Sequence, residues 1–157
     1  MKQKLPTFLL TCLTLTVGAF SSSAFAQTTP DAEGYWLTEN QRAVVKTEHC
    51  NGNQLCGKIH WIIEGGMQTD SKNPDEALRN RPMCGLEILN GFTQNRNNPK
   101  GWEGGHIYKA DDGDIYNATV TIKDDSHLWL RGYVGLPIFG KSQTWTRVNP
   151  DDYKQCK

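Results

Sequence analysis

Two short phrases decide the fold, Gly34-Tyr35-Trp36 near the start of the chain and Thr144-Trp145-Thr146-Arg147 near its end. The sequence between them is made of short alternating segments and has no long helical pattern. An indole on a first strand and a guanidinium on a last strand can stack, and such a cation–π contact contributes about 0.5–2 kcal/mol. Trp36 and Arg147 are the candidates for such a contact, and the family resemblance described below implies that it closes a barrel by tying the first strand to the last.

Working outward from these phrases, apolar and polar residues alternate, with turn signals roughly every 8–12 residues, which is typical of an antiparallel sandwich or barrel. The predicted strands are 35–38, 43–48, 58–63, 86–92, 102–109, 115–123, 128–134 and 141–148. Eight strands in chain order favour an all-β, antiparallel up-and-down barrel, whose interior holds side chains or one small ligand.

The same alternation predicts which side chains point inward, because successive residues of a strand face opposite sides. The inward residues expected on the third, sixth, seventh and eighth strands are Ile59, Trp61, Ile63, Tyr116, Ala118, Val120, Ile122, Leu128, Leu130, Gly132, Val134, Gln143 and Trp145. A barrel mouth with Trp61, Tyr116, Gln143 and Trp145 would offer flat apolar walls and one amide, as small-molecule pockets do. The same rings would also suffice to fill the lumen, and alternation does not separate the two arrangements.

One segment, 64–82, breaks the alternation. Asn73 can cap a helix, Pro74 suits its first position and Glu76 can complete a capping box, so we expect one short helix in the loop between strands 3 and 4. Leu78 should be buried beneath it, whether the loop is a lid over a ligand or a plug in one barrel mouth. Two further side chains of this loop could clamp an anion or pair with Asp70, Asp75 or Glu76; they are Arg79 and Arg81.

The N-terminus has the features of a secretory signal peptide: a basic start, an apolar stretch and the cleavage pattern Ala24-Phe25-Ala26. Its apolar core is shorter than the roughly 20 residues of a membrane span, and Cys12 follows Thr11 rather than the small residue of a lipoprotein site. We expect cleavage after Ala26, a flexible segment 27–33, a barrel domain 34–148 and a tail 149–157. The mature protein is then expected in the periplasm or outside the cell.

Composition argues against two classes of partner. The chain has 17 basic and 17 acidic residues, and since Lys2 and Lys4 would leave with the signal peptide, 15 basic residues would remain against 17 acidic ones. Both signs are interspersed, without the basic stripe that a nucleic-acid groove needs. An amphipathic membrane helix and a membrane span are also missing from the mature sequence.

Four cysteines follow the signal peptide: Cys50, Cys56, Cys84 and Cys156. An even count in an exported protein predicts two disulfides. Of the three pairings we favour Cys50–Cys56, because the Asn51-Gly52-Asn53 sequence between them is typical of a turn, and Cys84–Cys156 then follows. Their spacing is not that of a zinc knuckle, and no metal or cofactor is expected.

Four phrases together resemble one exported bacterial family, the domain-of-unknown-function family numbered 2147. They are Cys50 with Leu55-Cys56-Gly57-Lys58-Ile59; Asn73-Pro74 with Arg79-Asn80-Arg81-Pro82-Met83-Cys84-Gly85; Trp102-Glu103-Gly104-Gly105-His106-Ile107-Tyr108; and Arg131-Gly132-Tyr133-Val134-Gly135 with Phe139-Gly140-Lys141 and Gln143-Thr144-Trp145-Thr146-Arg147. The resemblance covers 34–148. It implies a lipocalin-like (calycin-type) barrel, sized for a small ligand, in the bacterial envelope, and it transfers no catalytic residue.

Catalytic patterns are weak. The histidines His49, His60, His106 and His127 form no H-E-x-x-H motif, and no Gly-x-Ser-x-Gly elbow occurs. We therefore expect no catalysis and favour a small-ligand-binding protein. The alternative is an envelope interaction module that binds a protein partner through Trp129, Arg131 and Tyr133, an aromatic–arginine cluster typical of interface hot spots. A hydrolase is a distant third, since it would need a perturbed carboxylate or histidine beside a cleft.

Overall fold

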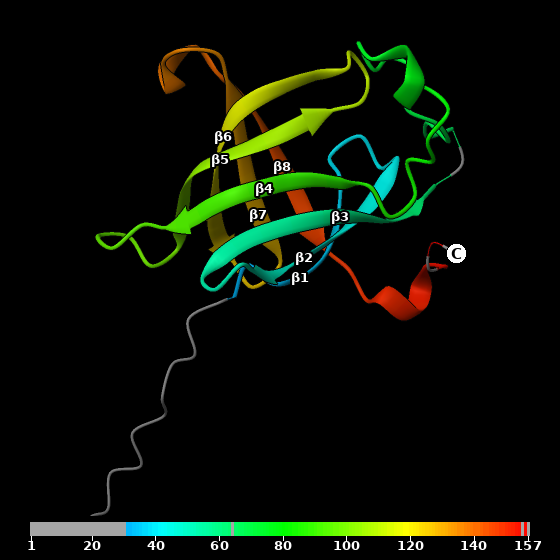
Figure 1. Cartoon of the computed structure of the whole chain (residues 1–157). Helices are drawn as coiled ribbons and strands as arrows, with labels where there is room; N and C mark the ends of the chain where they lie inside the picture. Colours follow the sequence, from blue (N-terminus) through cyan, green and yellow to red (C-terminus); the bar gives the residue numbers. More distant parts are fainter. Residues whose placement is uncertain (1–30, 64, 155, 157) are drawn as a thin grey trace, which may run out of the picture.

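The fold is an all-β barrel, seen in a computed structural model that describes residues 31–63, 65–154 and 156 (Figure 1). The predicted signal peptide and most of the segment 27–33 lie outside these residues. The eight strands are β1 Gly34–Leu37, β2 Ala43–Cys50, β3 Gln54–Ile62, β4 Glu87–Gln94, β5 Gly101–Lys109, β6 Asp114–Asp124, β7 His127–Tyr133 and β8 Lys141–Arg147. Each pairs antiparallel with the next and β8 pairs with β1, so the barrel is closed. The predicted eight-stranded meander is confirmed.

The barrel closes where Trp36 on β1 lies opposite Arg147 on β8. The Arg147 Cζ atom is 4.1 Å from the centre of the Trp36 ring, within the range of a cation–π contact. Trp36 is completely buried, and its indole N–H is shared between the Ala32 carbonyl at 3.1 Å and the Thr47 hydroxyl at 2.9 Å. Trp36 therefore enters the core with its one polar side-chain atom hydrogen-bonded.

The guanidinium of Arg147 also joins two backbone segments, the stretch before β1 and the β6–β7 turn. It donates hydrogen bonds to the carbonyls of Asp31 at 2.6 Å, Glu33 at 2.8 Å and Asp125 at 2.7 Å. Gly34 makes this approach possible, because a Cβ atom there would stand 2.2 Å from Arg147 Nη1. The φ of Gly34 is also +144°, which side-chain-bearing residues rarely adopt.

Inward-facing apolar side chains form one buried core inside the barrel. The buried core comprises Ala32, Trp36, Val45, Leu55, Ile59, Ile62, Met83, Ile88, Leu89, Phe92, Trp102, Ala118, Val120, Ile122, Leu128, Leu130 and Trp145. Gly57 and Gly105 leave room for this packing, since an added Cβ would clash with the side chains of Leu89 and Phe92 respectively.

The inward prediction for Trp61 and Ile63 is wrong, because β3 contains a bulge. Val45 pairs with Ile59 but the preceding Val44 pairs with Trp61, so one extra residue stands on β3. An extra residue reverses the alternation beyond it. Ile62 consequently points into the core and is 7% exposed, whereas Trp61 shares the outer face with Val44.

Val134 is a second correction to the inward set. The strand β7 ends at Tyr133, so Val134 belongs to the β7–β8 connection and is 73% exposed. Gly135, with φ +68°, turns the chain directly after it. Val134 therefore continues the apolar alternation in the sequence, but in the fold the strand has already ended and the side chain does not point inward.

The predicted helix in the loop between strands 3 and 4 is absent; the structure has only one 3-10 turn, η1, at Glu76–Leu78. Its N-cap is Asp75 rather than Asn73. The Asn73 side chain is used elsewhere, accepting from the Asp75 N–H at 2.9 Å and donating to Asp70 at 2.7 Å. A single turn presents no continuous apolar face, and Leu78 is accordingly 37% exposed rather than buried.

Two disulfides and the C-terminal tail complete the domain. Cys50 bonds to Cys56 and Cys84 bonds to Cys156, with Cα–Cα distances of 5.9 and 5.4 Å. Beyond β8 the tail contains the turn η3, Pro150–Asp152, and its Cys156 N–H donates to the His60 carbonyl of β3 at 2.8 Å. In the part of the chain that the structure describes, no helix is long and apolar enough to cross a membrane.

Candidate functional site

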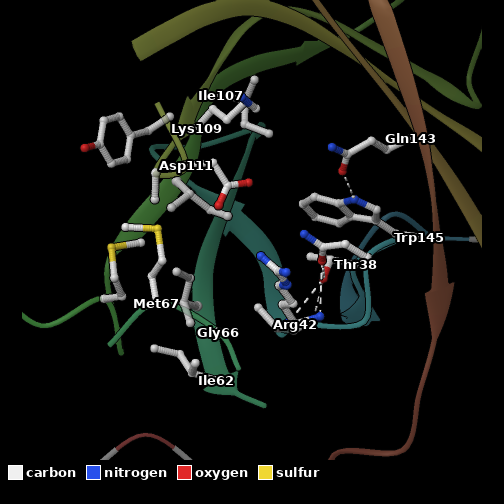
Figure 2. A pocket seen from close by; sticks show the side chains of 17 residues that line it. Thr38, Arg42, Ile62, Gly66, Met67, Ile107, Lys109, Asp111, Gln143 and Trp145 are labelled. Atoms are coloured by element: carbon white, nitrogen blue, oxygen red, sulfur yellow. Dashed lines mark hydrogen bonds between the residues drawn. The ribbon is translucent and has the colours of Figure 1, made fainter. Parts of the chain in front are cut away.

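The candidate site is a cavity at one end of the barrel. In an antiparallel meander the β1–β2, β3–β4, β5–β6 and β7–β8 connections lie at the same end, which we call the mouth; the other connections and the chain start lie at the closed end. The cavity opens between the mouth connections and has a volume of about 120 Å³ (Figure 2). It is lined by Thr38, Asn40, Arg42, Ala43, Ile59, Ile62, Gly66, Met67, Met83, Ile88, Ile107, Tyr108, Lys109, Ala110, Asp111, Gln143 and Trp145.

The floor of the cavity is apolar and comes from the barrel strands. Ile59, Ile62 and Ile88 belong to the buried core, and Trp145 on β8 is only 1% exposed. Figure 2 shows Met67 facing Trp145 across the opening. A thioether and an indole on opposite walls make a soft, polarisable slot for an apolar group.

Polar groups stand around the rim. The Trp145 indole N–H donates to the Gln143 side-chain oxygen at 2.9 Å, which leaves the Gln143 amide nitrogen as a donor at the opening (Figure 2). Arg42 projects from the start of β2, across the opening from Lys109 and Asp111. A bound molecule would therefore meet carbon atoms below and hydrogen-bonding or charged groups above.

The Lys109 ammonium belongs to a local ion pair. It contacts Asp112 in the β5–β6 turn, and this hydrogen bond raises the pKa of Lys109 above its ordinary value. Lys109 is consequently a fixed positive charge at the rim near neutral pH. An anionic group on a ligand could approach it together with Arg42.

The β3–β4 connection, residues 63–86, is held over the mouth by a buried carboxylate. Asp70 is completely buried and accepts hydrogen bonds from the Tyr108 hydroxyl, from Asn73 at 2.7 Å and from Arg81 Nε at 2.8 Å. Arg81 Nη2 completes a two-pronged ion pair at 2.8 Å. Since Tyr108 is on β5 and lines the cavity, this network fixes the connection to the cavity wall.

The pKa values of this network follow from its geometry. Burial alone would raise the pKa of Asp70, but the hydrogen bonds from Tyr108, Asn73 and Arg81 outweigh it and hold that pKa below its ordinary value. Burial and the adjacent carboxylate raise the pKa of Tyr108. The pair therefore stays as carboxylate and phenol, and the fastening is complete near neutral pH.

The structure separates the residues expected at the ligand site. Gln143 and Trp145 line the cavity, whereas Trp61 lies on the outer face of β3. Tyr116 stands beside Gly132 and turns its hydroxyl to Asp112, 3.0 Å away.

The two arginines of the β3–β4 connection hold that connection together. Arg79 donates to the Asn73 carbonyl at 2.9 Å and to Glu76 at 3.1 Å. Arg81 binds Asp70, as described above.

Sequence reasoning missed Arg42, Met67 and Met83 as cavity residues. The connectivity of a meander gives the signal for Arg42, since it follows the β1–β2 turn and that turn must lie at the mouth. The two methionines lie in a connection without periodicity, so no strand pattern could have placed them.

The outer surface of β7 holds the aromatic–arginine cluster expected for a protein partner. Trp129 lies under Lys123, whose Nζ atom is 4.3 Å from the ring centre, and Arg131 Cζ is 6.0 Å from it. However, Arg131 already donates to the Pro137 and Ile138 carbonyls and to the Ser142 hydroxyl. Its guanidinium supports the β7–β8 connection.

Comparison with known proteins places this geometry in a family. Residues 34–147 match the model of DUF2147, described as an uncharacterized protein conserved in bacteria, and the chain belongs to this family. Among solved structures it is similar to protein HP1028 from the human pathogen Helicobacter pylori, which is described as belonging to the lipocalin family. That likeness has a TM-score of 0.68 and 22% sequence identity and covers 79% of this chain and 87% of that one. No curated protein matches the chain.

The lipocalin-like barrel is thus the shared feature. The interior of an eight-stranded barrel is filled by side chains or holds one small ligand. Within the described residues, no group of three His, Cys, Asp or Glu side chains is arranged to hold a metal ion.

Proposed function

We propose that this protein binds a small, partly apolar ligand at the mouth of its barrel, without catalysis, in the periplasm or outside the cell. The observation that carries the proposal is the cavity itself, which combines an apolar floor with the polar rim of Arg42, Lys109 and Gln143. Lipocalin-like architecture supports it in general terms. The two disulfides support a location in an oxidising compartment.

The size of the cavity limits the ligand. Pockets for drug-sized molecules measure about 300–1,000 Å³, and this one measures about 120 Å³. A short acyl or aryl group with one polar head fits these dimensions better than a long lipid chain or a haem. The head would remain at the rim, within reach of the basic side chains.

Native mass spectrometry of the protein purified from its own host tests the proposal. We expect a bound small molecule under gentle conditions, which is lost in the variant Met67→Trp, because the larger indole occupies the slot opposite Trp145. Trp61→Phe is the matched control, since Trp61 is an aromatic residue on the outer face, and it should keep the ligand. A ligand-free spectrum of the unmodified protein, together with no binding of hexanoate or hexanol, would refute the proposal.

The second candidate function is an interaction module of the envelope that uses Trp129, Arg131 and Tyr133. Its support is the stacking of Lys123 and Arg131 around Trp129. Crosslinking in the host should then recover a protein partner that Trp129→Ala loses, while the melting temperature falls by only a few degrees. If the unmodified protein and Trp129→Ala recover the same partners, this function is rejected.

A further inference from the structure

Exposed apolar side chains gather in one connection at the mouth. Val134, Leu136, Ile138 and Phe139 are 73%, 64%, 76% and 79% exposed, and we call these four side chains the apolar tip. They come from the β7–β8 connection, residues 134–140, which contains the 3-10 turn η2, Pro137–Phe139, and is the orange loop that projects from the barrel in Figure 1. Large apolar groups concentrated at one exposed place usually mark an interaction surface.

Several backbone groups of the apolar tip are already hydrogen-bonded. Arg131 donates to the Pro137 carbonyl at 2.7 Å and to the Ile138 carbonyl at 3.1 Å. The Phe139 N–H bonds to the Leu136 carbonyl at 3.1 Å, and the Gly140 N–H bonds to the Pro137 carbonyl at 3.0 Å. Backbone groups that keep their partners can enter an apolar medium without the several kcal/mol that each orphaned group would cost.

The chain segment that carries the apolar tip has basic residues and no acidic ones. Residues 128–150 contain no Asp or Glu, although the whole chain has 17 acidic and 17 basic residues. Arg131 and Lys141 flank the apolar tip at its base. The neighbouring mouth connections do carry carboxylates: Glu39 accepts from the Thr144 N–H at 3.1 Å, and the β5–β6 turn has Asp111 beside Asp112, which is paired with Lys109.

We propose that the apolar tip docks the protein on an anionic lipid surface. Phe139, Ile138 and Leu136 would enter the boundary between headgroups and acyl chains, while Arg131 and Lys141 would remain at the level of the phosphates. Basic residues at such a surface contribute about 1 kcal/mol each. Docking brings the mouth of the barrel towards the membrane and does not depend on the cavity being occupied.

Two features favour a lipid surface over a second copy of the chain. The apolar side chains crowd a short projecting loop, which can enter a fluid surface without a matching groove. A stable protein dimer needs an interface of roughly 1,200–2,000 Å² in total, more than a single seven-residue connection can supply. A lipid surface needs only the apolar area and the complementary charge.

Vesicle sedimentation with the mature, disulfide-bonded protein tests the inference. We expect binding to vesicles that contain phosphatidylglycerol, at least tenfold weaker partitioning to pure phosphatidylcholine, and loss of binding as salt rises. The double variant Ile138→Ser/Phe139→Ser should lower partitioning at least tenfold. Leu78→Ser is the matched control, because Leu78 is an exposed apolar residue of another mouth connection, and it should bind as the unmodified protein does.

Three results would overturn the inference: no binding to anionic vesicles, equal binding to both lipids, or equal binding by the double variant. Sedimentation velocity without lipid supplies a further outcome. If the protein dimerises at micromolar concentration and Ile138→Ser/Phe139→Ser abolishes the dimer, a second copy covers the apolar tip and the lipid proposal fails. Near-UV circular dichroism of each variant, unchanged from the unmodified protein, shows that the fold persists.

Discussion

The two ends of the barrel use their side chains differently. At the closed end Trp36 is completely buried, and Arg147 stacks on its ring while binding three carbonyls. At the mouth the same sheet leaves a cavity of about 120 Å³ and a loop whose apolar side chains face solvent. The closed end has a hollow of its own beside Trp102, of about 210 Å³, but its Trp36 and Arg147 side chains serve to complete the sheet. The mouth instead keeps apolar and charged side chains available to bind other molecules.

The disulfides differ in the same way. Cys50–Cys56 closes a hairpin over a sequence separation of 6, whereas Cys84–Cys156 joins the end of the β3–β4 connection to the tail over a separation of 72. The closed end thus has a local crosslink and the mouth has a long-range one. The comparison teaches that the β3–β4 connection at the mouth, which belongs to no strand, is held by a long-range disulfide and a buried ion pair.

Removal of the long-range disulfide should have the largest effect. The chain-entropy model gives about 4 kcal/mol for Cys84→Ser/Cys156→Ser and about 2 kcal/mol for Cys50→Ser/Cys56→Ser. Urea denaturation of both double variants measures the difference. Equal losses, or a larger loss for the hairpin disulfide, would break the comparison between the two ends.

Removal of the closing guanidinium comes next. We expect Arg147→Ala to lower the free energy of unfolding by about 3 kcal/mol, because it removes both the stacking on Trp36 and the hydrogen bonds to the carbonyls. Arg96→Ala, in the exposed β4–β5 connection, is the control and should change stability by less than about 0.5 kcal/mol. An unchanged free energy of unfolding in Arg147→Ala would mean that the contact between Trp36 and Arg147 does not stabilise the closed end.

The buried carboxylate of the mouth should have a smaller effect. Asp70→Asn removes the charged acceptor from Arg81 and Tyr108, and we expect a loss of about 2 kcal/mol. Thermal unfolding at pH 7 measures it, and hydrogen exchange should show faster opening of the β3–β4 connection. A loss confined to the closed-end strands would contradict the assignment of this network to the mouth.

The pH dependence of the same group has a definite sign. The folded-state pKa of Asp70 lies below its ordinary value of 3.8. The contribution of Asp70 to the free energy of unfolding is therefore complete at pH values above 3.8, and it is lost as the pH falls through the lower, folded-state pKa. Asp70→Asn should flatten this acid limb of the stability curve; an unchanged limb would show that other carboxylates cause it.

The smallest effect is expected at Tyr116. Its hydroxyl donates only to the partly exposed Asp112, so Tyr116→Phe should change stability by less than about 0.5 kcal/mol. Binding of hexanoate, measured by calorimetry, should stay within about twofold, because Tyr116 does not line the cavity. A tenfold loss of hexanoate affinity would instead indicate that the ligand binds near the β5–β6 side of the mouth.

The closed end was predictable from the sequence, whereas at the mouth only Gln143, Trp145 and the Cys84–Cys156 pair were. Gly34, Trp36 and Arg147 resembled the closing contact of lipocalin-like barrels, and the strand periodicity supplied the rest of the barrel. Cysteine count and turn residues indicated the disulfide pairs. These signals depend on local patterns or on a few distinctive side chains.

The failures at the mouth have physical causes. The bulge at His60–Trp61 adds one residue to β3 and reverses the alternation, which no periodicity reveals. Asn73 was expected to cap a helix, but its side-chain amide instead donates a hydrogen bond to the buried carboxylate of Asp70. Met67 and Met83 reach the cavity through the course of an irregular connection, which is set by tertiary contacts.

The five tryptophans allow a direct test of the account. Trp145 lies in the cavity wall, Trp36 and Trp102 in the filled part of the core, and Trp61 and Trp129 on β3 and β7 outside the cavity. In a ¹H–¹⁵N spectrum their indole N–H signals report on these places separately during a titration with hexanoate. We predict that the chemical shift of the Trp145 signal changes and reaches a plateau during the titration, while the other four signals do not shift. A shift of the Trp36 or Trp102 signal instead, or no shift of the Trp145 signal, would contradict ligand binding at the mouth.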